Sequence, residues 1–156
     1  MRGSQTIIIA TASLLAAVAY AGGARAVDTI RPGYWESTNK VTTPITSTKT
    51  ERRCITPQAV DKFMGCYINH HYTCSCPAQS YTGGKISFHG DCVDAKQRHV
   101  LIDGEGAYTE TTLQMTARGR FNVLGGISIP FSAATDAHRI GDVCPAGVPG
   151  GASDGR

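Results

Sequence analysis

The 156-residue sequence predicts a mainly β protein: a single antiparallel meander sheet of seven or eight strands, curled into a partial barrel or sandwich, with one short helix against a face. Two observations predict this fold class. Turn-forming residues recur at short intervals between segments rich in β-branched and aromatic residues. The chain also lacks the alternation of strand and helix that builds a parallel sheet.

The first 26 residues have the form of a secretory signal peptide. Arg2 precedes an apolar run at 7–19, and small residues then lead to Ala24-Arg25-Ala26. The run is shorter than the roughly 20 residues of a transmembrane helix, and Ala-x-Ala is the pattern that signal peptidase reads. We therefore expect cleavage after Ala26 and a soluble mature protein in the periplasm or secreted. An uncleaved membrane anchor is the alternative.

The mature chain is expected to be one nearly neutral domain. Removal of Arg2 and Arg25 leaves 13 basic and 12 acidic residues, so the pI of 8.6 for the whole chain overstates its basicity. A near-neutral surface argues against nucleic acid or an anionic membrane as the main partner. We expect a disulfide-stapled β domain over 27–144 and a disordered Gly- and Pro-rich tail over 145–156.

The first elements of the domain are two strands and the helix. Residues 34–42 contain the only tryptophan and predict a strand, and 45–53 is expected to return antiparallel to it. Helix signals then follow in order: Thr56 suits an N-cap, Pro57 suits the first helical position, and Gly65 suits the helix end. Residues 56–65 therefore predict a short helix, with an ordered loop as the alternative.

The remaining strands are predicted from Gly-containing turns. Segments 72–81 and 85–92 flank Gly83-Gly84 and indicate a hairpin. Gly104-Glu105-Gly106 is expected to be a second tight turn, between strands at 98–103 and 107–118. Segments 120–124 and 127–140 supply a further strand or two, interrupted by Pro130.

The cysteines predict a disulfide framework, because six of them follow the signal peptide of an exported protein. Six cysteines allow fifteen pairings. The hairpin brings Cys92 opposite either Cys74 or Cys76. We favour the pairs Cys74–Cys92, Cys54–Cys144 and Cys66–Cys76.

A metal site is conceivable at His70, His71, Cys74 and Cys76, since imidazole and thiolate are zinc and copper ligands. In a strand, however, His71 would point away from the other three side chains. The sulfurs are also expected to be oxidised. We expect solvated histidines beside a disulfide, and no cofactor.

No common catalytic signature is present. The sequence contains no nucleophile elbow, zinc-protease motif, phosphate-binding loop or dinucleotide fingerprint. Asp103 and Glu105 could form an acid/base pair or a weak calcium site, but the calcium-loop spacing is missing. We interpret them as residues of a solvated turn, and we expect no enzyme.

Four segments in order resemble the "domain of unknown function 3617" family. They are 31–36 (RPGYWE), 54–58 (CITPQ), a cysteine-bounded hairpin ending at Cys92, and 138–144 (HRIGDVC). The resemblance implies a small exported protein of Gram-negative bacteria and brings no established activity. The chain departs from the family pattern at Gln58, in one residue inserted before the last cysteine, and in the additional Cys66 and Cys76.

Three functions are compatible with these residues. The first is a non-enzymatic binding module that holds a small apolar or amphipathic ligand on the concave face of the sheet. Its expected ligand face comprises Tyr34, Trp35, Tyr108, Leu113 and Met115, although the same residues could form an ordinary core. The second is an envelope structural or protein-interaction domain that pairs through a sheet edge. The third is a metal-handling protein or enzyme using His70 and His71.

Overall fold

The computed structural model describes residues 28–43, 45–66, 71–122 and 127–150. The expected signal peptide at 1–26 lies outside them. Within these ranges, no helix combines the length and the apolar character needed to cross a membrane.

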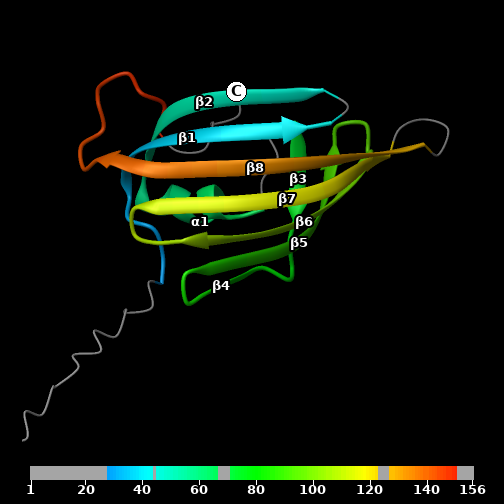
Figure 1. The fold of residues 1–156 in the computed structure, drawn as a ribbon, viewed down its shortest axis with the longest axis horizontal. Coiled ribbons are helices and arrows are strands. Elements are labelled where there is room, and N and C mark those ends of the chain that lie inside the picture. Colours follow the sequence, from blue (N-terminus) through cyan, green and yellow to red (C-terminus); the bar gives the residue numbers. More distant parts are fainter. Residues whose placement is uncertain (1–27, 44, 67–70, 123–126, 151–156) are drawn as a thin grey trace, which may run out of the picture.

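One antiparallel sheet of eight strands forms a half-barrel (Figure 1), which confirms the expected fold class. The sheet order is β2-β1-β8-β7-β6-β5-β3, and the short β4 also pairs with β5. The strands are β1 Gly33–Thr42, β2 Thr46–Ile55, β3 Tyr72–Ser75, β4 Ser80–Thr82, β5 Lys85–Asp94, β6 His99–Tyr108, β7 Thr112–Asn122 and β8 Ser128–Gly141.

The predicted helix is confirmed as a 3-10 turn, η1 Pro57–Ala59, that continues into α1 Val60–Met64. The Thr56 carbonyl accepts the first hydrogen bond, from the Ala59 N–H at 3.0 Å. The helical segment packs on the inner side of the half-barrel, where the Phe63 ring lies 5.7 Å from that of Trp35. It therefore closes part of the concave face.

The hydrophobic core lies between the inner face of the sheet and this helix. Inward positions alternate with polar outward positions, as in β5, where every second residue is buried. The fully buried side chains with the largest volumes are Trp35, Ile30, Ile55, Met64, Leu113, Val100 and Cys92.

The expected turn at Gly104–Gly106 is wrong, because β6 runs straight through it and the chain turns at 109–111 instead. These glycines are needed for close packing. A β-carbon at Gly104 would lie 2.5 Å from Cε1 of Phe88, and one at Gly106 would lie 2.9 Å from Cγ of Met115. The strand boundaries at 98–103 and 107–118 are corrected accordingly.

The expected interruption at Pro130 is also wrong, since β8 is continuous. Pro130 pairs with Arg120 of β7, whereas β1 begins to pair with β8 only at Ser132. One side of β8 is therefore without a strand at Pro130, and a residue that lacks an N–H can occupy such an edge.

The expectation of a disordered tail is corrected for residues 145–150, which lie beside β2. The Cys54 N–H donates to the Pro149 carbonyl at 3.0 Å, and Cys54 and Gly150 form an isolated parallel bridge. The Cys54–Cys144 disulfide holds the start of this segment at the edge strand, whose outward N–H groups would otherwise lack partners. Residues 151–156 lie outside the described part.

Candidate functional site

Three of the five residues of the expected ligand face are core residues. Trp35 and Leu113 are 0% exposed and Tyr108 is 4% exposed. Their polar atoms also have internal partners, since Trp35 Nε1 donates to the Arg31 carbonyl at 3.0 Å and the Tyr108 hydroxyl donates to that of Asp28 at 3.3 Å. A ligand could reach them only by displacing packed side chains.

The other two residues of the expected ligand face, Met115 and Tyr34, lie on opposite faces of the sheet. Met115 is partly buried against the core. Tyr34 belongs to the outer face, because it precedes the inward-facing Trp35 in β1 and neighbouring residues of a strand point to opposite faces. The five residues therefore do not form one face, because side chains alternate between the two faces along β1 and this separates Tyr34 from Trp35.

An apolar hollow of about 300 Å³ lies at the end of the half-barrel where β1 and β7 finish and β8 begins. Its lining residues are Thr43, Tyr72, Arg98, Val100, Phe121, Asn122 and Ile129. Phe121 pairs directly with Val100 on one side and Ile129 on the other, so all three share the inner face. The sequence analysis missed this hollow.

Aromatic rings form one wall of the hollow. The rings of Tyr72 and Phe121 have centroids 6.3 Å apart, and those of Phe121 and Phe131 are 4.5 Å apart. Continuing the inward series Leu113, Met115, Ala117 by four residues would have predicted Phe121 on this face. The expected strand, 107–118, stops three residues short of Phe121.

An ion pair between the buried Asp94 and the half-exposed Arg98 lies beside the hollow. Asp94 accepts the backbone N–H groups of Lys96 and Arg98, each at 2.9 Å, and Arg98 Nε at 2.7 Å. The hydrogen bonds from Arg98 hold the pKa of Asp94 below its usual range, and Asp94 in turn raises the pKa of Arg98. The Arg98 side chain is half exposed and is one of the residues that line the hollow.

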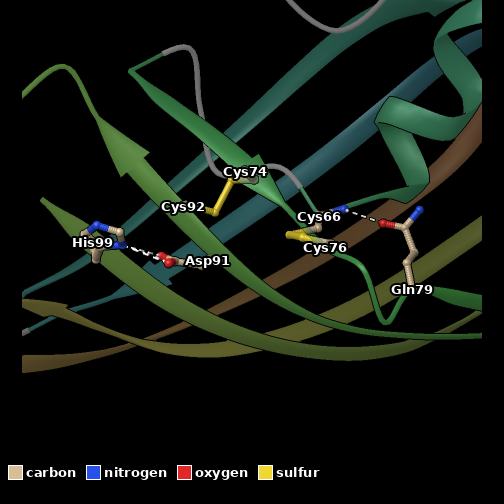
Figure 2. The surroundings of a disulfide bond; sticks show 7 residues. All are labelled: Cys66, Cys74, Cys76, Gln79, Asp91, Cys92 and His99. Carbon is tan, nitrogen blue, oxygen red and sulfur yellow. Dashed lines mark hydrogen bonds and ion pairs between the residues drawn. A yellow bond between two sulfur atoms is a disulfide. The ribbon is translucent and has the colours of Figure 1, made fainter. Parts of the chain in front are cut away.

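The six cysteines pair as Cys54–Cys144, Cys66–Cys76 and Cys74–Cys92, the pairs that we favoured. Disulfides of this number are typical of a protein from an oxidising compartment. The last two lie side by side on the inner face of β5 (Figure 2). Cys74 and Cys92 are direct partners in the β3–β5 ladder, and Gly90 lies beneath the Cys66–Cys76 bond.

The expected metal-ligand set does not come together as four free ligands. Cys74 and Cys76 belong to two different disulfides. His71 is exposed just before β3, and His70 lies outside the described residues. A disulfide sulfur carries no thiolate charge, so these sulfurs do not fit a zinc site in the oxidised protein.

Comparison with known proteins gives the chain a family. The profile of a family described as "Protein of unknown function (DUF3617)" matches residues 30–144. The chain belongs to the DUF3617 family. The match includes the whole sheet, the helix and both ends of the Cys54–Cys144 bond. No curated protein and no solved structure matches it.

The outer face of this DUF3617 sheet is polar and open. Asp103 and Glu105 project there from the middle of β6 and not from a turn. His89 lies 2.6 Å from Asp103, and His99 lies 2.8 Å from Asp91. These are exposed cross-strand pairs, which is the ordinary environment of a solvated histidine.

Proposed function

We propose that this DUF3617 domain is a non-enzymatic binding module of the periplasm that takes a small apolar or amphipathic ligand. The observation that supports it is the aromatic-walled hollow at Tyr72, Phe121 and Ile129. Its volume is at the lower end of the range for ligand sites, which are concave and mostly apolar. The expected ligand face at Trp35 is replaced in this proposal by the open end of the half-barrel.

The rim defines the chemistry of the ligand. An apolar body would contact the rings of Tyr72 and Phe121, while the half-exposed Arg98 would face its polar end. Arg98 remains bound to Asp94, so a ligand anion would share this guanidinium, which has five N–H donors. We therefore favour ligands with one small anionic head.

The test uses 8-anilinonaphthalene-1-sulfonate, an apolar fluorophore with one anionic group, titrated against the full mature chain. Ile129→Gln places an amide in the hollow and should raise the Kd of the probe roughly tenfold, equivalent to about 1.4 kcal/mol. Leu101→Gln is the matched control, because Leu101 is 50% exposed on the outer face. Circular dichroism must first show both variants folded.

Equal probe affinity in wild type, Ile129→Gln and Leu101→Gln would contradict a site in the hollow. The proposed export is tested separately by the intact mass of protein from the periplasmic fraction. Cleavage after Ala26 gives a chain that begins at Val27. A mass that retains residues 1–26 would contradict it.

A second candidate, an envelope protein-interaction domain, is favoured by the free edge of β2. Among the described residues, one backbone hydrogen bond joins this edge to a segment outside the sheet, and its donor is the Cys54 N–H. In an antiparallel strand the N–H groups point alternately to one side and the other, so those of Thr50 and Thr48 also point outward. Lys49 and Arg53 pair with Glu51, and Arg52 pairs with Glu36 of β1, so these five side chains carry one net positive charge, which favours an acidic partner strand.

Thr50→Pro tests this candidate, because it removes an outward N–H while leaving the β1–β2 ladder intact. A photo-crosslinker at residue 48 should capture a protein in the periplasm of wild-type cells and lose it in Thr50→Pro. Lys40→Gln, on β1, serves as the control. An unchanged crosslink in Thr50→Pro would contradict pairing at this edge.

A further inference from the structure

Two disulfides lie close together on the inner face of β5. The Sγ atoms of Cys66, Cys74 and Cys92 all lie within 4.8 Å of one another. Because Cys74 and Cys92 are bonded together, Cys66 lies close to both atoms of the neighbouring bond. Such proximity is what an exchange reaction between a thiol and a disulfide requires.

The register of β5 builds this arrangement. Gly90 and Cys92 are successive inward positions of the strand, about 7 Å apart. The missing side chain of Gly90 leaves room for the Cys66–Cys76 bond, since a β-carbon there would lie 2.6 Å from Cys66 Sγ. Cys92 places the second bond directly beside the first.

The two bonds differ in their access to solvent at one sulfur. Cys66, Cys74 and Cys76 are each partly exposed, whereas Cys92 is 0% exposed. A reductant from solution therefore reaches Cys66–Cys76 more easily than the Cys92 sulfur. Cys54 and Cys144 belong to no comparable sulfur group among the residues that the structure describes.

We propose that these four cysteines form a thiol–disulfide exchange centre, in which reduction of the partly exposed Cys66–Cys76 bond is passed to the neighbouring Cys74–Cys92 bond, whose Cys92 sulfur is buried. This activity is independent of the proposed ligand site. It requires a dithiol reductant as the electron donor.

Each step balances. One thiolate of the dithiol attacks Cys76 Sγ, the Cys66–Cys76 bond breaks, and Cys66 leaves as a thiolate. The second thiol of the reductant then displaces Cys76, so the reductant leaves as a disulfide and the protein has gained two electrons. The Cys66 thiolate next attacks Cys74 or Cys92 and forms a disulfide with it. The bond between those two breaks, and the displaced sulfur takes a proton from water.

The test creates the attacking thiol without a reductant. Cys76→Ser leaves Cys66 unpaired beside Cys74–Cys92, and Cys144→Ser is the matched control that leaves Cys54 unpaired elsewhere. Each protein is held at pH 8, quenched with acid, and digested with pepsin at low pH, where thiolates are absent. Disulfide-linked peptides are then identified by mass spectrometry.

We expect Cys66–Cys74 or Cys66–Cys92 peptides in the monomer of Cys76→Ser. They should be at least roughly ten times as abundant as any new linkage in Cys144→Ser, because exchange rates depend on access to the attacked sulfur. A free thiol that stays on Cys66 alone, as it stays on Cys54 in the control, would overturn the proposal.

A second measurement avoids any folding defect in the variants. Wild-type protein is equilibrated with dithiothreitol until the species with two thiols predominates, and that species is mapped in the same way. The proposal predicts that the thiols within this group are distributed over all four of its cysteines; thiols of Cys54 and the exposed Cys144 are counted separately. Thiols confined to Cys66 and Cys76 would count decisively against it.

Discussion

Gly90 lies so close to Cys66 that a β-carbon at this glycine would stand 2.6 Å from the Cys66 sulfur. The Cys66–Cys76 disulfide therefore occupies the space that any other residue at position 90 would need. Because Gly90 is an inward position in the middle of β5, neither the strand nor the disulfide can move far without disturbing the β5–β6 ladder.

Gly90→Ala should lower the free energy of unfolding by about 1 to 3 kcal/mol, the usual cost of overpacking a core. Urea denaturation measures the loss. Gly150→Ala is the control, because a β-carbon there meets nothing within 4 Å. Introducing Gly90→Ala into Cys66→Ser/Cys76→Ser should reduce the cost; an undiminished cost would mean that the sulfurs are not the obstacle.

The long-range disulfide should be the most stabilising. Cys54–Cys144 has a sequence separation of 90 residues and Cys66–Cys76 one of 10. In the chain-entropy treatment, replacing each pair by serines lowers the free energy of unfolding by about 4.6 and about 2.7 kcal/mol, respectively. Urea midpoints of the two double variants measure this difference. The opposite order would contradict an origin in the unfolded chain.

Asp94 should make stability depend on pH. Its pKa is lower in the folded chain, chiefly through the Arg98 backbone hydrogen bond. The resulting stabilisation is present above the unfolded pKa of about 4 and is lost as the pH falls through the lower folded pKa. Asp94→Asn should therefore be less stable than wild type at pH 7, and the difference should shrink in acid. Asp136→Asn, at an exposed carboxylate, is the control variant measured at the same pH values.

Tyr81 and Tyr108 should respond oppositely to loss of the hydroxyl group. The Tyr81 hydroxyl is buried without a hydrogen-bond partner among the described residues, whereas that of Tyr108 donates to Asp28. Tyr81→Phe should leave the free energy of unfolding unchanged or raise it by up to about 1 kcal/mol, and Tyr108→Phe should lower it by about 0.5 to 1.5 kcal/mol. Thermal denaturation compares the two, and equal losses would contradict this assignment.

The burial of the Tyr81 hydroxyl also predicts that this tyrosine ionises at a higher pH than a free tyrosine. Desolvation raises the pKa of Tyr81 to about 12, above the value of 10.0 for a free tyrosine. The neutral form is thus favoured in the folded chain, and its contribution to stability is lost as the pH rises from about 10 toward 12. Absorbance of phenolate is measured as the pH is raised, in wild type and in Tyr81→Phe. The variant should lack the titration step that occurs at the highest pH in wild type. If the variant instead lacks a step near pH 10, the raised pKa of Tyr81 is contradicted.

Local patterns in the sequence determined much of this fold. The alternation at Leu113 and Met115, the Thr56-Pro57 helix start and the Gly83-Gly84 turn each depend on residues a few positions apart, and each predicted its element. The hairpin likewise placed Cys92 opposite Cys74 or Cys76, and the structure pairs it with Cys74. Such signals are readable because backbone conformation and strand pairing at short range follow from neighbouring residues.

The tertiary structure alone decided what depends on contacts between distant segments. Gly104 lies in a strand because the ring of Phe88 covers it, and Pro130 is accommodated because β1 ends before reaching it. Trp35 is buried in the hydrophobic core and Phe121 lines a hollow, although both are inward-facing aromatic residues of the same sheet. The difference is that α1 covers one end of the half-barrel and not the other, and no local pattern states which surface a distant helix will bury.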